Sequence, residues 1–303
     1  MFGALLFLVK MPVLAFVLLF VLVASYAKNL LLFAALIRPA ERFLNFMFFR
    51  TLITQFGANK STLRFHGQHK DFNYLEFSQG RNVPNHSNYI SEGDKTIILS
   101  NEASLLDYLY LCTSFSPVFV QIDIMGIDQM GLRILGRWEL LKKAIGVSLP
   151  QPRTDLFTSF EDLLASQAIK RPLVVFPQCA RTNGRGVLDF PPSVVALLQT
   201  AASKHAFKLH AVRFDYDFTY SSPFNTTNEA GWSHALAMLC QFVQPLQAQY
   251  YFDAHNYTGK DFHQHLKTTL MSPGHEYSLQ LEWRGAAAFL DYHRQQMQTK
   301  KRN

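Results

Sequence analysis

The turn around residues 100–107 carries side chains suited to acid–base chemistry. A β-like run at 95–100 (KTIILS) ends there, and a helix-like run begins just after it. Polar residues lie between the two runs and at the start of the second: Asn101, Glu102, Ser104 and Asp107. Because ligands of α/β proteins bind beyond the carboxyl ends of strands, these four residues are candidates for a functional site.

A second polar turn follows the β-like run at 172–177 (PLVVFP). Its sequence is FPQCARTNGRGVLDF, and it contains Arg181, Asn183 and Gly184. An arginine with flanking glycines lets a guanidinium and the backbone approach a phosphate closely. A glycine-containing surface turn has the same composition, so composition alone leaves both interpretations open.

The elements that must position these turns alternate between strand and helix. β-like runs occur at 62–67, 95–100, 117–122, 172–177, 208–214 and 246–252. Helical patterns occur at 103–114, 129–144, 154–168, 192–205, 232–243 and 276–298, and residues 69–94 are predicted to form a long loop. This alternation predicts an α/β fold, in which a mostly parallel sheet is flanked by helices on both faces. We expect one such domain over residues 61–303.

The composition limits the classes of partner. Of 303 residues, 49% are hydrophobic and only 17% are charged, and the formal net charge is +7. A basic chain attracts phosphate groups, but the middle of the sequence has no basic run with interleaved aromatic residues, so nucleic acid is not expected as a partner. The three cysteines are widely spaced and form no CxxC pair, which favours a reduced compartment without a disulfide framework.

Residues 1–37 are predicted to be a membrane anchor. The charge-free run 11–27 reaches the short limit of a spanning helix, which needs about 17–25 residues. The segment fits a single span or a hairpin, whereas a cleavable signal peptide fits poorly because no positive charge precedes the first apolar block. Residues 38–60 are rich in Phe and Arg and are predicted to form an amphipathic helix at the interface, on the cytosolic side that basic residues favour.

The last four residues, Lys300-Lys301-Arg302-Asn303, allow two interpretations. They resemble the dilysine retrieval signal of endoplasmic reticulum membrane proteins, which acts only in the cytosol. A charged, frayed chain end has the same composition.

Taken together, the two turns resemble motifs of the glycerolipid acyltransferase family, the lysophosphatidate acyltransferases. The first family motif reads roughly N-H-x-S-x-x-D, and residues 101–107 read NEASLLD, with Glu102 at the His position. The third reads roughly F-P-E-G-T-R-x-N-G, and residues 176–184 read FPQCARTNG, with Gln178 at the Glu position. The second motif is faint and ends at Arg153, and the fourth is only loosely present. The layout of residues 1–255 is similar to a fungal branch of this family found on the endoplasmic reticulum and lipid droplets.

The resemblance implies a reaction, its partners and a location. In the family, a His takes a proton from a glycerol hydroxyl, an Asp orients that His, and the hydroxyl attacks the thioester of acyl-CoA. Carried over by position, Glu102 and Asp107 are the catalytic pair, with Asn101, Ser104 and Gln178 supporting them. The implied phosphate-binding residues are Arg181, Asn183, Gly184 and Arg153. The implied partners are a lysophospholipid, acyl-CoA as co-substrate and the membrane, with no bound cofactor and the domain facing the cytosol.

Glu102 is the main departure from the family pattern. The pKa of an imidazole is about 6.5 and that of a glutamate about 4.3, and a general base works best with a pKa near ambient pH. The like charge of Asp107 and burial beside the membrane are both expected to raise the pKa of Glu102. Acyl transfer is the first hypothesis; a catalytically impaired protein that binds lipid or acyl-CoA, or a membrane scaffold, is the alternative.

Other residue patterns are weaker candidates for chemistry. His263 and His265 lie two apart on a predicted helix and point to different sides, so no metal site is expected. Cys179 stands where the family has Gly and is interpreted as a small-residue substitution rather than a nucleophile. The apolar stripe of the predicted helix 276–298 is interpreted as core packing. Neither G-x-G-x-x-G nor GxxxxGK[ST] occurs in the sequence, which argues against nucleotide binding.

Overall fold

The structure is a computed structural model that describes part of the chain. The described residues are 10–12, 15, 61–66, 95–124, 130–145, 156–167, 171–182, 186–203, 207–216, 234–235, 246–251, 262–270, 278–282, 285, 288 and 292. Nearly all of the predicted anchor 1–37, the interfacial helix within 38–60 and the loop 69–94 lie outside them. Over the described residues, no helix is long and apolar enough to cross a membrane.

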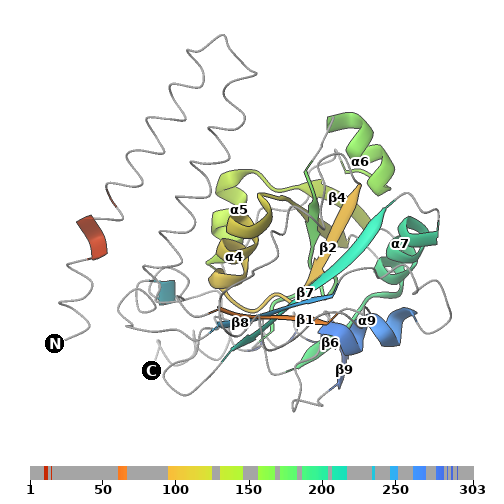
Figure 1. Cartoon of the computed structure of the whole chain (residues 1–303). Coiled ribbons are helices and arrows are strands. Elements are labelled where there is room, and N and C mark those ends of the chain that lie inside the picture. Colours follow the sequence, from red (N-terminus) through yellow and green to blue (C-terminus); the bar gives the residue numbers. More distant parts are fainter. Residues whose placement is uncertain are drawn as a thin grey trace, which may run out of the picture.

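A seven-stranded sheet forms the centre of the described part of the chain, in the order β1-β8-β7-β2-β5-β3-β4 (Figure 1). The strands are β1 (Ser61–His66), β2 (Thr96–Ser100), β3 (Val118–Ile124), β4 (Met130–Ile134), β5 (Leu173–Val175), β7 (Lys208–Tyr216) and β8 (Leu246–Tyr251). The pairs β1·β8, β7·β2, β2·β5 and β5·β3 are parallel, whereas β8·β7 and β3·β4 are antiparallel. The predicted mostly parallel α/β sheet is therefore confirmed, with two antiparallel pairs that make it a mixed sheet. A second, two-stranded sheet pairs β6 (Val187–Asp189) with β9 (Ser278–Glu282).

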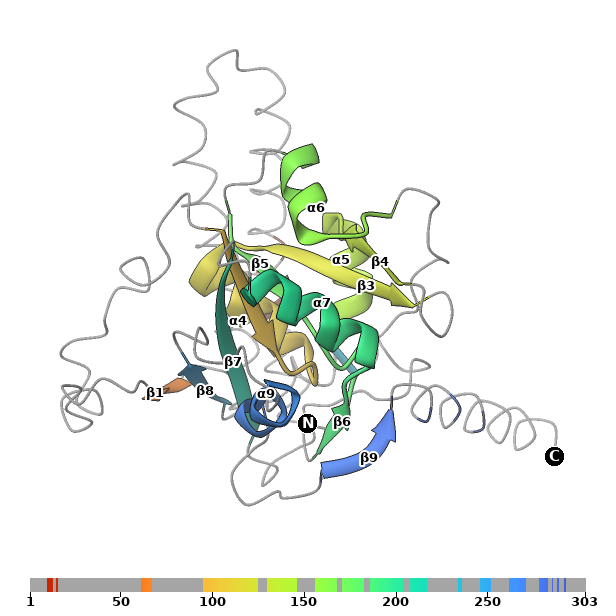
Figure 2. The ribbon, with the colours of Figure 1, turned by 90° about the vertical axis from the view of Figure 1, so that its right-hand side faces the viewer.

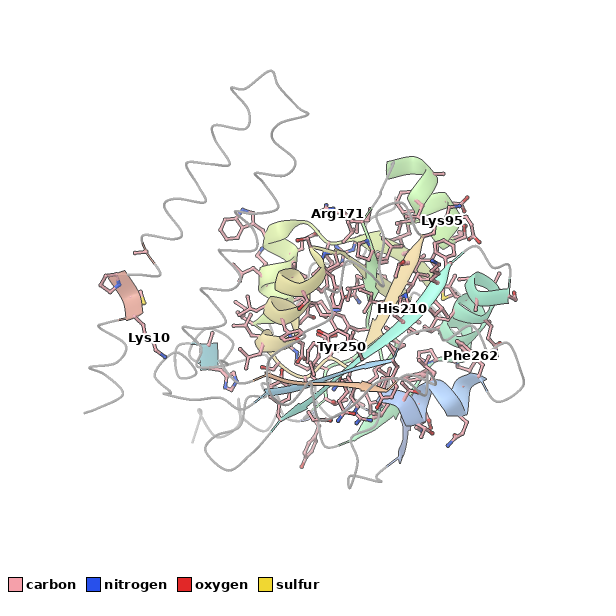
Figure 3. The ribbon with its side chains drawn as sticks, in the orientation of Figure 1. Lys10, Lys95, Arg171, His210, Tyr250 and Phe262 are labelled. Carbon is pink, nitrogen blue, oxygen red and sulfur yellow. The ribbon has the colours of Figure 1, made fainter. Side chains whose placement is uncertain are left out.

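Helices cover both faces of the large sheet. On one face, α4 (Leu105–Phe115) and α5 (Arg137–Ala144) pack in a hydrophobic cluster with Ile98 of β2. On the other, α6 (Phe160–Gln167), α7 (Pro192–Ser203) and α9 (Phe262–Leu270) pack with Ile97 and Leu99 of the same strand. Figure 2 shows α7 and α9 on the opposite side of the sheet from α4. Figure 3 labels one residue of each cluster, Tyr250 and Phe262. Because strand side chains alternate between faces, the consecutive apolar residues of β2 are buried on both sides of the sheet.

Two predicted helices are partly wrong. Residues 130–134 of the predicted helix 129–144 form strand β4, which pairs antiparallel with β3, and the helix α5 begins only at Arg137. Gly131 lies so close to Leu156 that an added Cβ would be 2.5 Å from the Leu156 Cβ, so the strand depends on a glycine at this point. Residues 278–282 of the predicted helix 276–298 form strand β9. The apolar stripe assigned to that helix therefore begins on a strand.

Candidate functional site

The two polar turns meet because their strands are parallel neighbours. β2 pairs in parallel with β5, with Leu99 opposite Val175. The segments that follow the two strands therefore leave the sheet side by side, at the carboxyl ends of the strands. The backbone N–H of Thr182 then donates a hydrogen bond to the backbone carbonyl of Glu102 at 3.0 Å. The two turns therefore lie side by side, and Glu102 lies within 3.5 Å of the Arg181 guanidinium.

Asn101 holds the first turn against a third strand. Its side-chain amide donates to the carbonyl of Phe214 at 3.0 Å and accepts from the N–H of the same residue at 2.8 Å. Phe214 belongs to β7, the other parallel neighbour of β2. Since the amide is buried, these two bonds fix the path of the chain immediately before Glu102.

Ser104 and Asp107 form the N-terminal cap of α4. The Ser104 hydroxyl accepts from the N–H of Leu106 at 3.2 Å, while Asp107 Oδ2 accepts from the N–H groups of Ala103 at 2.7 Å and Ser104 at 2.8 Å. This reciprocal arrangement is a capping box, which satisfies backbone donors that the first helical turn leaves free. Here the polar residues of the first motif build the turn.

Asp107 contacts the end of β7 through its second carboxylate oxygen. Its Oδ1 accepts a hydrogen bond from the Tyr216 hydroxyl. Burial raises the pKa of Asp107 to about 6, although the Tyr216 and backbone hydrogen bonds oppose the rise. No hydrogen bond joins the Asp107 and Glu102 side chains in the described structure. At the position that the resemblance assigns to the orienting Asp, Asp107 instead caps helix α4.

Glu102 is a buried carboxylate between two cations. Its Oε1 accepts from the Tyr108 hydroxyl at 2.7 Å and lies 3.5 Å from Arg181 Nη2, and its Oε2 lies 3.4 Å from Lys143 Nζ. Burial raises its pKa, but the charges of Lys143 and Arg181 and the Tyr108 hydrogen bond outweigh burial, so the pKa lies below its usual value. The expected rise in the pKa of Glu102 is therefore wrong, because the sequence did not reveal the second cation. A carboxylate with a lowered pKa is a weak general base.

Lys143 is a site residue that sequence reasoning missed, as are Tyr108 and Gln121. Lys143 comes from the last turn of α5, donates to the Gln121 side-chain carbonyl on β3, and lies over the Phe176 ring at 5.3 Å from its centroid. The sequence showed only a Lys142-Lys143 pair at the end of a helical pattern. The adjacent Lys142 is exposed, so the packing of α5 on the sheet decides which lysine enters the site.

Arg181 joins Glu102 to the carboxyl end of α5. Its Nη2 donates to the backbone carbonyl of Lys143 at 2.6 Å, and its guanidinium lies 5.9 Å from the centroid of the Tyr108 ring. A cation at this end of a helix is stabilised by the carbonyls that lack a helical partner. Arg181 therefore links the second polar turn to α5 and to Glu102.

Gln178 and Cys179 occupy the positions where the second turn departs from the family pattern. Gln178 is fully buried, and its amide nitrogen and oxygen have no hydrogen-bond partner among the described residues. Cys179 has a φ of 55°, a backbone conformation that favours glycine. Burial raises the pKa of its thiol to about 12, so it is not activated as a nucleophile.

The remaining predicted site residues, Arg153, Asn183 and Gly184, lie outside the described residues. Their phosphate-binding roles stay predictions, as do the catalytic roles of Glu102 and Asp107. Within the described ranges, no group of three His, Cys, Asp or Glu residues is placed to hold a metal ion. His263 lies on helix α9, as predicted.

The fold is similar to that of a solved acyltransferase structure. No family model matches the chain, and no curated protein matches it. The crystal structure of the 1-acyl-sn-glycerophosphate (LPA) acyltransferase PlsC from Thermotoga maritima aligns over 88% of this chain and 94% of that chain, with a TM-score of 0.48 and 12% identity. The resemblance to a fungal branch of the family stays a prediction.

Proposed function

We propose that this protein is an acyltransferase-like enzyme that transfers an acyl chain from acyl-CoA to a lysophospholipid such as lysophosphatidate in glycerolipid synthesis. The observation that carries this proposal is the contact between the two motif turns. Thr182 and Arg181 of the second turn contact Glu102 of the first at one edge of the sheet. The residues that resemble the family's base and phosphate positions thus belong to one buried cluster.

In this proposal Glu102 acts as an anchor for two cations and is not an efficient base. Its carboxylate is ionised and contacts Tyr108, Lys143 and Arg181. Loss of a well-tuned general base typically costs about 10²–10⁴ in rate, and positioning of two reactants recovers part of the acceleration. We therefore expect transfer that is slow and that depends on Arg181 and Lys143.

The second candidate is binding of lipid or acyl-CoA without turnover. It is favoured by the burial of Glu102, which is 3% exposed, and by the engagement of both carboxylate oxygens. Such a protein would hold the same ligands and give no product. A membrane scaffold is a further form of this candidate, in which the site residues have no effect on function.

Acyl transfer from radiolabelled oleoyl-CoA to lysophosphatidate by the full chain in liposomes separates the candidates. Wild type is compared with Glu102→Gln, with Glu102→His, which restores the family base, and with Asp162→Asn as a control for charge loss on the exposed surface of α6. We expect product from wild type and a rate increase for Glu102→His. An inert wild type that still binds both ligands contradicts transfer and supports the second candidate.

We also propose that residues 1–37 anchor the protein in the endoplasmic reticulum membrane or on lipid droplets, with the domain facing the cytosol. The support is the apolar run 11–27, together with the formal charge of +7. Protease protection of the domain in sealed microsomes tests the orientation. Protection before the membranes are opened would contradict a cytosolic domain.

A further inference from the structure

The Glu102 cluster contains more positive than negative charge among the groups in direct contact. Lys143 and Arg181 approach the single Glu102 carboxylate at 3.4 and 3.5 Å. The next carboxylates have donors of their own: Asp107 binds Tyr216 and backbone N–H groups, and Asp123 pairs with Arg133 at 3.0 Å. Among the direct contacts one anion therefore faces two cations, while the charges of Asp107 and Asp123 act on Arg181 and Lys143 from further away.

Neutral acceptors hold both cations more closely than Glu102 does. Arg181 donates to the Lys143 carbonyl at 2.6 Å, and Lys143 donates to the Gln121 side chain. Both ion-pair distances to Glu102 exceed the 2.7–2.9 Å that is typical, roughly, of charge-assisted N–H···O bonds. The cations thus keep their places without a tight contact to the carboxylate.

A phosphate monoester matches this arrangement better than a carboxylate. Its second pKa is about 6, so it carries about −1.5 to −2 charges near neutral pH and offers three acceptor oxygens. An ammonium and a guanidinium side by side are the side chains that bind such groups most often. The carboxylate of Glu102 has one charge and already accepts from Tyr108, so it offers the two cations less charge and fewer free acceptor sites than a phosphate does.

We propose that Lys143 and Arg181 together bind a phosphate monoester and that Glu102 is the internal counter-ion which occupies the cations when no ligand is bound. This inference rests on the proposed function and deepens it, since it adds Lys143 to the binding site and gives Glu102 a competing role. The ligand is the headgroup phosphate of lysophosphatidate or the 3′-phosphate of CoA. A negative charge beside the ligand phosphate weakens binding, so Glu102 promotes release.

The test measures ligand affinity of the full chain in detergent micelles by calorimetry. Four probes form two matched pairs, lysophosphatidate against monoacylglycerol and CoA against 3′-dephospho-CoA. The variants are Glu102→Gln, Lys143→Met and the control Lys142→Met, which removes the adjacent exposed lysine of the same helix. We expect Lys143→Met to weaken, and Glu102→Gln to tighten, binding of one phosphate-bearing probe at least tenfold, with its phosphate-free partner and the control unchanged.

Three outcomes decide the inference. Tightening by Glu102→Gln with the lipid pair or with the CoA pair supports it and identifies the phosphate source. Unchanged or weaker binding in Glu102→Gln overturns it, even when wild type transfers acyl chains and the proposed function stands. If the variants show the expected affinity changes but the wild type gives no acylated product, the phosphate site is supported and acyl transfer is rejected.

A second variant keeps the test decisive if Glu102→Gln fails to fold. Glu102→Asp retains the charge but shortens the side chain by one methylene, which withdraws the carboxylate from the cations. We expect Glu102→Asp to bind the phosphate-bearing probe more tightly than wild type, by a smaller factor than Glu102→Gln. Weaker binding in Glu102→Asp would overturn the counter-ion role.

Discussion

The stability of the Glu102 cluster gives a quantitative test through a double-mutant cycle with Lys143. The two side chains are 4% and 15% exposed, and their charged atoms lie 3.4 Å apart. At an effective dielectric constant of about 20, unit charges at about 4 Å interact by about 4 kcal/mol, and breaking a buried pair costs about 3–5 kcal/mol. Lys143→Met leaves Glu102 paired with Arg181, whereas Glu102→Gln leaves two neighbouring cations unbalanced. We therefore expect costs of about 1 and about 3 kcal/mol, and a coupling of about 2 kcal/mol in the double variant.

The assay is thermal unfolding of the full chain in detergent, followed by tryptophan fluorescence. A loss of 1 kcal/mol corresponds to about 2 °C for a domain of this size, so Glu102→Gln is expected to lower the Tm by about 6 °C. Adding Lys143→Met to Glu102→Gln should raise the Tm again, because it removes one unbalanced cation. The control Lys142→Met should change the Tm by less than about 1 °C. Strictly additive effects, or a Glu102→Gln protein as stable as wild type, would refute the ion-pair reasoning.

Further predictions concern the turns around the site. Because burial raises the pKa of Asp107 from 3.8 to about 6, its contribution to stability is present below pH 3.8 and is lost as pH rises through 6, an effect of about 3 kcal/mol. Asp107→Asn should therefore gain stability relative to wild type between pH 4.5 and 7.5 in thermal scans; a constant difference would contradict the raised pKa. Asn101→Ala leaves the buried N–H and carbonyl of Phe214 without partners and should cost about 2–4 kcal/mol in chemical denaturation; a loss under 1 kcal/mol would argue against the bridge to β7. Cys179→Gly and Ser116→Gly relieve positive φ angles of 55° and 45° and should each raise stability by about 0.5–1 kcal/mol, whereas lower Tm values for both would show that the lost contacts matter more.

The centre of the sheet could be predicted from sequence because β2 and β5 are short, mostly apolar runs. Five buried residues form β2, and β5 carries only Leu173, Val174 and Val175, so hydrophobicity alone located both. The segment after β3 was predicted to be helical, but it forms β4, which pairs antiparallel with β3. The apolar residues of a run as short as β4 fit the period of a strand and also that of a helix. The sequence therefore gave no reason to separate β4 from the helix α5 that follows it.

The candidate site could be predicted only where its residues follow strands. Glu102 and Arg181 come directly after parallel neighbours, so topology brings them together. Tyr108, Lys143 and Gln121 enter from helices and from the middle of a strand, and their positions depend on how α4 and α5 pack. The pKa of Glu102 was predicted in the wrong direction for this reason, because one unseen cation reversed the balance between burial and charge.

In the proposed function, the cluster of Glu102, Lys143 and Arg181 supports acyl transfer. The most direct measurement is the formation of phosphatidate from oleoyl-CoA and lysophosphatidate by the full chain in liposomes, with wild type beside Arg181→Ala and the surface control Lys142→Met. We expect product from wild type and from the control, and a loss of at least tenfold in Arg181→Ala. No product from wild type, or full activity of Arg181→Ala, would contradict this function.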